Sequence, residues 1–307
     1  MERTVHLSEK GMRLERFLRV HFPRLPAAAL LLKQGRLTVD GRKARASDAL
    51  AAGQVVRIAE PTPRRPVEGQ AAGEGARRAP SEADRVRLAA MTLFSDDDLL
   101  VLDKPAGLAV HAGTRTDDDL DRLLARFVDA EGERPVLVHR LDKDTSGLLV
   151  AAKRGREAAR LGRAFASRAV EKTYVAVVAG VPDPAELTIV LLLKKIETPR
   201  GGRMVAVAPD DPAGLAAETL CRVVEIRDGG RAALVALSPH TGRQHQLRAH
   251  LGEIGHPILG DRLYGRAGSA PRLMLHALRL LLPTPTGGTR VFETAWPEAF
   301  GKRPDAI

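Results

Sequence analysis

The stretch "VHRLDKDTSGLLVAAK", residues 138–153, places a dense polar cluster between two apolar runs. Residues 139–147 alone contain two carboxylates, two cations, a histidine and two hydroxyls. Short apolar runs bounded by polar clusters predict buried strands joined by a turn. Surface turns are ordinarily filled by Gly, Asn, Asp or Pro, and a charge beside a core costs free energy unless it is paired or used. The charges of this turn therefore mark it as a candidate functional loop.

The chain of 307 residues is long enough for two domains, one of which can bury a substantial core. Hydrophobic residues make up 44% of it, as in ordinary soluble globular proteins. The single cysteine, Cys221, excludes an internal disulfide framework and indicates a reducing compartment. No apolar run approaches the roughly 20 residues that span a bilayer, and the charged N-terminus has no apolar signal region. We therefore expect a cytoplasmic protein with no membrane partner.

The net charge of +10 is concentrated at the N-terminal end of the chain. Residues 1–58 contain 12 lysines and arginines against 5 acidic residues, whereas residues 85–307 contain 32 against 28. So basic a segment indicates a polyanionic partner, most often a nucleic acid. The alternative is a solvated basic surface that keeps the protein soluble. Aromatic residues, at 3%, are too few for a long base-stacking groove of the kind found in single-strand-binding proteins.

Residues 59–84 separate two units of the chain. This segment is dense in Pro, Gly, Ala and charged residues with almost no apolar periodicity, which is the composition of a flexible linker. In the basic unit, residues 1–58, apolar spacing predicts helices around 14–18 and over 26–35. The Asp40–Gly41 pair predicts a hairpin turn, and 54–58 predicts a closing strand. The basic residues near that turn are candidate RNA contacts: Arg36, Arg42, Lys43 and Arg45.

The larger unit, residues 85–307, combines strands and helices. Apolar runs predict strands over 98–104, 134–139, 147–153, 172–180, 218–228 and 231–239. Helical spacing predicts helices over 118–132 and 155–170, and a third that opens with Thr241 as its N-cap. Strands linked by hairpins with interspersed helices predict an α+β fold with a mixed, largely antiparallel sheet. The sequence contains neither G-x-G-x-x-G after a predicted strand nor G-x-x-x-x-G-K-[ST], the two glycine-rich motifs that bind nucleotide phosphates. No nucleotide cofactor is therefore expected.

Four histidines near the C-terminal end of the chain do not have the spacing of a metal site. His240, His245, His250 and His256 are 5, 5 and 6 residues apart. Helical metal ligands lie three or four residues apart, whereas an interval of five turns two side chains about 140° away from each other. We expect no metal and interpret these histidines as hydrogen-bonded structural groups or RNA contacts.

Asp142 and Asp144 are the candidate carboxylates of the opening stretch. We expect this segment to be extended, with one carboxylate in a pocket and the other pointing away, so that they do not act as an acid/base pair. A single buried aspartate facing an arginine would keep its charge through a charge-assisted pair and could act as a nucleophile. The alternative is a structural ion pair that fastens the loop to the third helix. The pattern alone leaves both open.

The order of the motifs resembles that of the RluA-type pseudouridine synthases. The stretch "HRLDKDTSGLLVAAK" is similar to that family's central signature, H-R-L-D-x-x-T-S-G. The similarity extends over residues 92–297 and includes, in the family's order, "LVLDKPAGLAVH", "KTYVAVVAG", "TGRQHQLRAHL", "GHPILGDRLYG" and "LMLHALRL". The N-terminal unit resembles the small RNA-binding domain that many members share with a ribosomal small-subunit protein.

This resemblance implies roles for individual residues. Asp142 corresponds to the aspartate that attacks during uridine isomerisation, and Arg140 to the arginine that fills the gap left by the flipped uridine. Tyr174 corresponds to the tyrosine that lies against the flipped base and takes part in proton abstraction; Lys172, close to it, is a candidate RNA contact. Arg248 corresponds to the basic residue paired with the aspartate. Asp144 falls on a variable position of the signature.

The resemblance implies an RNA pseudouridine synthase, an isomerase without a cofactor, with residues 85–307 as its catalytic domain. Large-subunit ribosomal RNA is the expected substrate, with transfer RNA as the second choice, and a monomer is expected. One rival interpretation is a non-catalytic RNA-binding ribosome-assembly factor that keeps the fold. Another is a metal-dependent RNA hydrolase, which the lack of a ligand cluster in the sequence disfavours.

Overall fold

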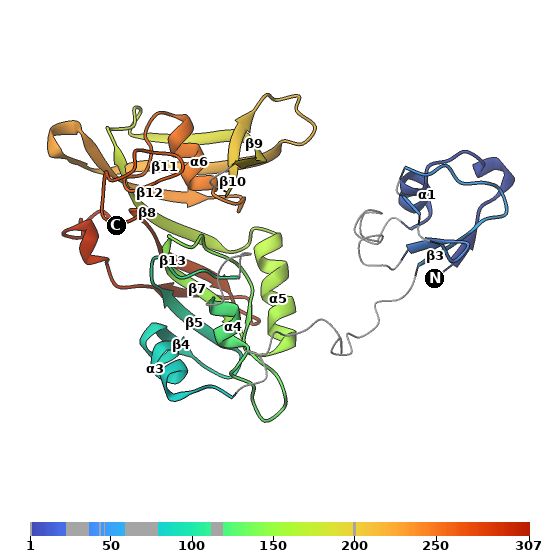
Figure 1. Ribbon diagram of the computed structural model, residues 1–307, viewed down its shortest axis with the longest axis horizontal. Coiled ribbons are helices and arrows are strands. Elements are labelled where there is room, and N and C mark those ends of the chain that lie inside the picture. The colour runs from blue at the N-terminus through green and yellow to red at the C-terminus, as the bar shows by residue number, and fades with distance from the viewer. Residues whose placement is uncertain are drawn as a thin grey trace. The chain divides into compact units, whose positions relative to one another are not determined.

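The computed structural model describes residues 2–22, 37–42, 44–45, 47–58, 79–111, 119–198 and 201–307. The chain divides into two compact units, residues 1–71 and 72–307. Figure 1 draws the first in blue and the second in colours from cyan to red. Among the described residues, no helix is long and apolar enough to cross a membrane.

The described residues of the smaller unit form a three-stranded antiparallel sheet, one α-helix and one short 3-10 helix. The strands are β1 (Glu2–Thr4), β2 (Leu37–Val39) and β3 (Val55–Ile58), in the order β1–β3–β2, and the helices are η1 (Leu7–Glu9) and α1 (Leu14–His21). Leu14, Phe17 and Leu18 repeat at helical spacing and bury one face of α1 in a core shared with Val56 and Ile58 of β3. The predicted helix over 26–35 lies outside the described residues, as do Arg36 and Lys43.

The predicted turn at Asp40–Gly41 is confirmed. Both residues have positive φ, 49° and 74°, as the two central residues of a tight hairpin turn require. Val39 and Arg42 form a bridge across the turn. However, β2 forms its antiparallel hydrogen-bonded pairs with β3 rather than with the residues that directly follow the turn. The predicted strand at 54–58 therefore completes this sheet.

The larger unit is built on one sheet of eleven strands, nine of them in the order β10–β9–β11–β12–β8–β13–β7–β5–β4, with β14 beside β13 and β6 beside β7. The strands are β4 (Thr92–Ser95), β5 (Leu99–Lys104), β6 (Val136–Leu137), β7 (Ser146–Ala152), β8 (Glu171–Ala179), β9 (Glu186–Thr198), β10 (Gly201–Val207), β11 (Leu215–Arg227), β12 (Ala232–Pro239), β13 (Leu275–Pro283) and β14 (Thr289–Glu293). The helices are α3 (Glu82–Met91), α4 (Leu120–Leu124), α5 (Gly155–Ala166), α6 (Gln246–Glu253), η3 (Asp228–Gly230) and η4 (Glu298–Phe300). Among the described strands, β7 and β13 form the one parallel pair. The expected α+β fold with a mixed, mostly antiparallel sheet is confirmed.

Two of the predicted elements are much shorter than expected. The predicted strand over 134–139 is reduced to the two residues of β6, because the His139 ring takes the place of a backbone partner: its Nε2 accepts the Val150 N–H at 2.9 Å. The helix predicted over 118–132 is reduced to α4. After α4 the Asp129 carboxylate accepts the N–H groups of Glu131 and Glu133, which satisfies these donors outside a helix.

The predicted linker over 59–84 ends before residue 84. Helix α3 begins at Glu82 with Ser81 as its N-cap: the Ser81 side chain accepts the Asp84 N–H, and the Asp84 carboxylate accepts the Ser81 N–H. Asp84 also binds Arg126 at 2.6 Å. Residues 81–84 thus belong to the larger unit, and residues 59–78 lie outside the described part of the chain.

Strand β7 is buried on both faces, which explains why its sequence is continuously apolar rather than alternating. Leu148 and Val150 pack in a core with Leu161 of α5, whereas Leu149 and Ala151 pack in another core on the opposite face, with Leu123 of α4. The two cores thus place α5 against one face of this part of the sheet and α3 and α4 against the other. The turn that precedes β7 is thereby fixed at the centre of the unit.

The start of β7 requires a glycine. Gly147 has φ +108°, and a Cβ atom built on it would lie 2.2 Å from the carbonyl oxygen of Ala277 in β13. The absence of a side chain lets the two parallel strands approach where the opening stretch ends. Only glycine combines this backbone conformation with so close an approach.

Candidate active site

The turn before β7 carries Asp142 into a pocket. Leu141 is buried in the core, Asp142 next to it is 16% exposed at its side chain, and Asp144 is exposed. The Thr145 N–H donates to the Asp142 carbonyl oxygen at 3.1 Å, so the segment is a turn. The expectation of an extended segment was wrong, and residues two apart in a strand would share a face. The turn is what separates the two carboxylates.

A buried lysine holds the backbone of this turn. The Lys104 side chain is fully buried, and its Nζ donates to three carbonyl oxygens at 2.9 Å, those of Pro105, Leu108 and Lys143. Burial lowers the pKa of Lys104 to about 8, against the opposing charges of Asp144 and Asp142. Lys104 therefore fixes the residue that follows Asp142.

Arg248 of α6 lies between two carboxylates. Its Nε and Nη2 donate to Asp261 at 2.7 and 2.8 Å, and its Nη1 lies 3.5 Å from Oδ2 of Asp142. Burial opposes the charge of Arg248, but the hydrogen bonds and charge of Asp261, followed by the charge of Asp142, outweigh it and raise the pKa of Arg248. The tightest partner of Arg248 is thus Asp261, and the pairing with Asp142 implied by the resemblance is the longer contact.

His245 is a second group that faces Asp142. Its Nε2 lies 3.9 Å from Oδ1 of Asp142, and its Nδ1 lies 3.2 Å from the hydroxyl of Tyr264. His245 occupies the N-cap position of α6 with a left-handed backbone (φ 50°, ψ 18°). Burial lowers the pKa of His245, and the charge of Asp142 opposes this effect.

The pocket is lined from the opening stretch, from β8 and from the loop before α6. Tyr174 and Lys172 come from β8, and Tyr174 also contacts both large core clusters of the unit. Burial, and then the charge of Asp142, raise the pKa of Tyr174, so its phenol is protonated at neutral pH. Burial, and then the charge of Arg168, lower the pKa of Lys172.

Gln246 fixes the wall of the pocket that precedes α6. Its Oε1 accepts from the Thr241 hydroxyl (2.7 Å) and the Arg243 N–H (3.0 Å), and its Nε2 donates to the Glu218 carbonyl (2.9 Å) and the Thr219 hydroxyl (3.0 Å). The prediction that Thr241 is the N-cap of α6 is therefore wrong: His245 occupies that position. Thr241 lies five positions before the first helical residue, Gln246, and its hydroxyl donates to the Gln246 side chain instead.

Ser146 connects the turn to a buried chain of side chains. Arg272 donates to the Ser146 hydroxyl (2.8 Å), which bonds Nδ1 of His276 (2.8 Å), while Nε2 of His276 bonds the Thr294 hydroxyl (2.6 Å). Burial, and then Arg272, lower the pKa of His276 to about 4, so the ring is neutral. Ser146 therefore bonds to two other side chains, those of Arg272 and His276.

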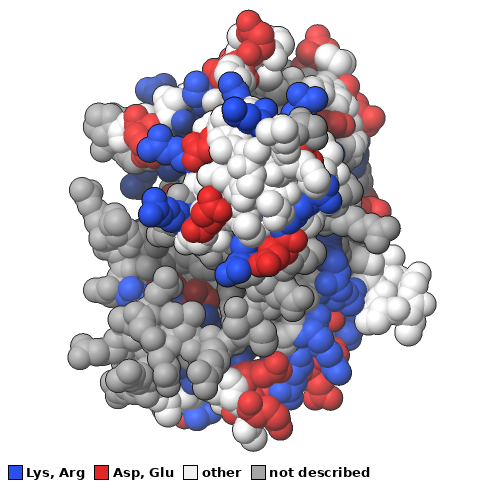
Figure 2. Space-filling model, turned by 90° about the vertical axis from the view of Figure 1, so that its right-hand side faces the viewer, with Lys and Arg blue, Asp and Glu red and all other residues white. Residues whose placement is uncertain are grey.

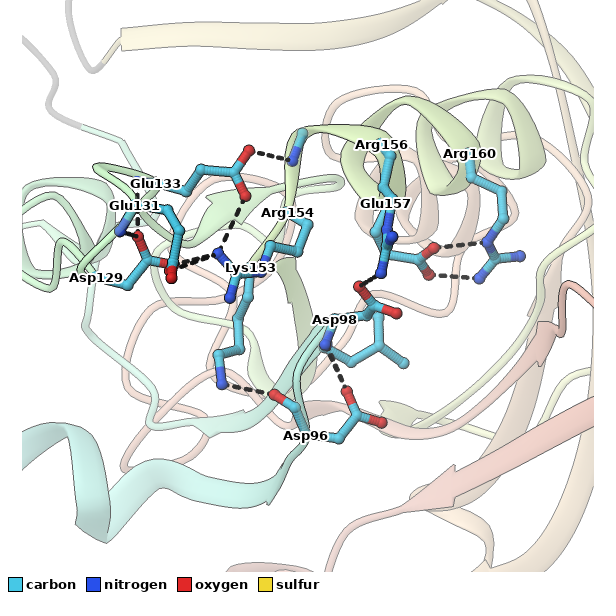
Figure 3. Close-up of polar contacts among 12 residues, drawn as sticks. Asp96, Asp98, Asp129, Glu131, Glu133, Lys153, Arg154, Arg156, Glu157 and Arg160 are labelled. Atoms are coloured by element: carbon cyan, nitrogen blue, oxygen red, sulfur yellow. Dashed lines mark hydrogen bonds and ion pairs between the residues drawn. The ribbon is translucent and has the colours of Figure 1, made fainter.

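The charged residues at the start of α5 form a separate network outside the pocket (Figure 3). Arg154 binds Asp129, Glu131 and Glu133. Arg156 binds Asp98, and Arg160 binds Glu157. On the face drawn in Figure 2, lysine and arginine side chains likewise lie among acidic ones. Arginines paired in this way stabilise the fold locally and are poor candidates for phosphate contacts.

The structure brings five of the predicted site residues into one pocket: Arg140, Asp142, Lys172, Tyr174 and Arg248. Arg42 and Arg45 are exposed in the smaller unit. The prediction missed Lys104, Asp261, Tyr264 and the contact of His245 with Asp142. Their signal in the sequence was slight: Lys104 lies in the block "LVLDKPAGLAVH", and Asp261 and Tyr264 lie in "GHPILGDRLYG".

Comparisons with known proteins point to one family. The sequence model of the family described as RNA pseudouridylate synthase matches residues 98–253. Ribosomal large subunit pseudouridine synthase C of Salmonella typhimurium is 34% identical over 292 residues, which cover 91% of this chain and 88% of that protein. An uncharacterized RNA pseudouridine synthase of Zymomonas mobilis is 39% identical over 216 residues, 69% of this chain and 96% of that protein.

A solved structure agrees with the sequence comparisons. Human RNA Pseudouridylate Synthase Domain Containing 4 superimposes with a TM-score of 0.58 at 28% sequence identity. The superposition covers 71% of this chain and 94% of the human one. Both the sequence and the arrangement of the sheet are therefore similar to those of proteins named for the same chemistry.

Proposed function

Because this chain belongs to the RluA-type RNA pseudouridine synthases, which isomerise uridine to pseudouridine, we propose that Asp142 is its catalytic nucleophile. The observation that carries the proposal is the position of the Asp142 carboxylate, in a pocket, 3.5 Å from the Arg248 guanidinium. A carboxylate facing a fixed cation stays ionised and can donate an electron pair to the substrate. The alternative of a purely structural ion pair is disfavoured, because Asp261 already satisfies Arg248 through two hydrogen bonds.

In the proposed reaction, Asp142 forms a transient covalent bond with the nucleoside while the N1–C1′ bond breaks. The detached uracil turns, carbon 5 bonds to C1′, and the proton on carbon 5 is lost while N1 regains one. No atom is gained or lost overall, so the reaction needs no oxidant, reductant or co-substrate. The bond that carbon 5 forms with C1′ displaces Asp142 from the nucleoside, which restores its carboxylate before the product is released.

Tyr174 is proposed to lie against the flipped base and to take part in the removal of the carbon 5 proton. Stacking on an aromatic ring contributes about 1–3 kcal/mol per base, which offsets part of the cost of extruding a base from folded RNA. Because the raised pKa keeps the phenol protonated, Tyr174 can accept the carbon 5 proton only while it passes its own to a neighbour. The regenerated Asp142 carboxylate lines the same pocket and is the candidate acceptor.

Arg140 and Lys172 are proposed to bind the RNA around the flipped nucleotide. Both line the pocket, and the Arg140 side chain is exposed at its rim, where it can enter the space vacated by the base. The Lys172 ammonium is half-buried beside Arg168, an arrangement that favours a phosphate between them.

Large-subunit ribosomal RNA is the proposed substrate, with transfer RNA as the second candidate, and residues 1–58 are proposed to form an RNA-binding domain. The name of the Salmonella relative, which aligns with 91% of this chain, supports the ribosomal assignment. The excess of basic residues in 1–58 and the exposed Arg42 and Arg45 support a contact of this unit with phosphates. A tethered RNA-binding unit would raise the local concentration of the catalytic unit near its uridine.

Tritium release from RNA labelled at carbon 5 of uridine tests these proposals. The wild-type chain is expected to release tritium from ribosomal RNA, and Asp142→Asn is expected to release none while it still binds. Arg156→Ala, in the network of Figure 3, is the matched control and is expected to retain full activity. Activity in Asp142→Asn would refute the nucleophile, and release from transfer RNA alone would overturn the ribosomal assignment.

A further inference from the structure

The chain contains only two tyrosines, and both lie close to Asp142. Tyr174 lines the pocket, whereas Tyr264 reaches the site through His245, whose Nδ1 is 3.2 Å from the Tyr264 hydroxyl. The mechanism proposed above uses neither Tyr264 nor His245. The contacts nevertheless lead from Tyr264 through His245 to the candidate nucleophile, because Nε2 of His245 lies 3.9 Å from Oδ1 of Asp142.

The hydrogen bonds around Tyr264 determine which nitrogen of His245 carries the proton. The Met204 N–H donates to the Tyr264 oxygen at 2.8 Å. The hydroxyl proton of Tyr264 is then free to be donated to Nδ1 of His245. A neutral imidazole that accepts at Nδ1 carries its proton on Nε2. That N–H faces Asp142.

Several contacts hold this pair of rings in place. His245 has a left-handed backbone, which is uncommon outside glycine and is maintained only where the surroundings impose it. The Tyr264 ring meets the His245 ring edge-on, with centroids 5.8 Å apart. The guanidinium carbons of Arg203 and Arg248 lie 4.9 and 5.3 Å from the Tyr264 centroid. The position of the imidazole is thus fixed by its own backbone and by its neighbour.

We propose that His245 is a positioning residue for Asp142, held by Tyr264 with its proton on Nε2. This N–H steadies Oδ1 of the carboxylate while Nη1 of Arg248 steadies Oδ2. The distance of 3.9 Å shortens to a hydrogen bond when RNA enters the pocket, because catalytic contacts are commonly long before the substrate binds. The inference rests on the proposed role of Asp142 as nucleophile.

The charges that face His245 come from three parts of the fold. They are Asp142 and Arg140 of the opening stretch, Arg248 of α6, and Asp261 with Tyr264 of the segment after α6. Burial within this set lowers the pKa of His245. A hydrogen bond donated to Nδ1 further favours the neutral ring, so the loss of that bond would raise the pKa of the imidazole.

The protonated nitrogen of His245 can be observed directly by ¹⁵N–¹H NMR of the full chain, with His245→Asn used to assign the resonances. The proton is expected on Nε2 in the wild type and on a mixture of both nitrogens in Tyr264→Phe. A proton on Nδ1 of the wild type, or an unchanged tautomer in Tyr264→Phe, would overturn the proposal. This measurement does not depend on activity, so it is separable from the test of Asp142 by Asp142→Asn.

Kinetics test the consequence for the reaction. Tyr264→Phe is expected to lower kcat about 10-fold with KM unchanged, because a His245 ring that carries its proton on Nδ1 cannot donate to Asp142. His245→Asn keeps a residue that tolerates the left-handed backbone and is expected to lower kcat by about 10- to 100-fold. His111→Asn, a half-exposed histidine outside the pocket, is the control and is expected to change neither constant. A change in KM alone, or an unchanged kcat in both Tyr264→Phe and His245→Asn, would overturn the positioning role.

Discussion

Arg248 donates two hydrogen bonds to Asp261 and turns its third nitrogen, Nη1, toward Asp142 at 3.5 Å. Asp261 is fully buried at its side chain and also accepts the N–H groups of Leu263 and Tyr264, so this carboxylate is itself immobile. The cation that faces the candidate nucleophile is thus oriented by a carboxylate that does not line the pocket.

Asp261→Asn is expected to leave the Arg248 charge buried without its partner. Removal of one member of a buried ion pair lowers the free energy of unfolding by about 3–5 kcal/mol. The misplaced guanidinium is expected to lower kcat by roughly 10- to 100-fold as well. Urea denaturation and tritium release measure the two effects. Asp98→Asn, which breaks the exposed pair with Arg156, is the control, and equal urea midpoints for the two variants would contradict the buried pair as an anchor.

Lys104 is expected to make stability depend on pH above neutrality. Its pKa is about 8 in the folded chain and 10.5 in the unfolded one, so between these values the unfolded chain binds more protons. The free energy of unfolding therefore rises with pH across this window, by roughly 3 kcal/mol in total. Below pH 8 both states are protonated and the contribution of this group does not change.

The measurement is the difference between the wild type and Lys104→Met, followed by urea denaturation from pH 7 to 10.5. Lys104→Met leaves three carbonyl oxygens without their donor and is expected to be less stable at every pH. The gap between the two proteins should widen as pH rises. A constant gap would mean that Lys104 keeps an ordinary pKa in the folded chain.

The sequence identifies the residues proposed to contact the substrate better than it identifies the residues that hold them in place. Asp142, Tyr174 and Arg248 lie in contiguous motifs, so a pattern of neighbours in the chain marks each of them. Lys104 contacts the carbonyl of Lys143 across 39 residues of sequence, and such a contact depends on strand order. No local periodicity in the sequence indicates the order of the strands in the sheet.

The strand order itself shows the same limit. Apolar runs predicted β5, β7, β8, β11 and β12, because buried strands bounded by turns have a local signature. They did not predict that β13 lies between β7 and β8, parallel to one and antiparallel to the other. Because β13 lies next to β7, Gly147 approaches Ala277 closely and the turn is fixed. This contact can be seen only in the folded chain.

Gly147→Ala is expected to be strongly destabilising. The added Cβ would lie 2.2 Å from the Ala277 carbonyl oxygen, and the φ of +108° disfavours any side chain, so β7 and β13 must separate. We expect a loss of at least about 3 kcal/mol in the free energy of unfolding, together with the loss of activity. Gly162→Ala in the middle of α5 is the matched control. Its Cβ meets nothing within 4 Å, so the better helix propensity of alanine should raise stability by about 0.5–1 kcal/mol. Thermal denaturation of both variants should show opposite shifts, and a shift of the same sign in both would contradict the close approach of the two strands.

The double variant Arg42→Ala, Arg45→Ala is expected to weaken RNA binding and to make it less sensitive to salt. Each arginine that neutralises a phosphate releases counterions on binding, which contributes about 0.7–0.9 to the slope of log K against log salt. Loss of two such contacts should reduce the slope by roughly 1.4–1.8. Filter binding of labelled ribosomal RNA across a range of salt concentrations measures it. Arg57→Ala is the control within the same unit, because Arg57 is engaged by Glu2 at 2.9 Å and should contribute less. If the double variant and the wild type have the same slope, these two arginines do not contact phosphates.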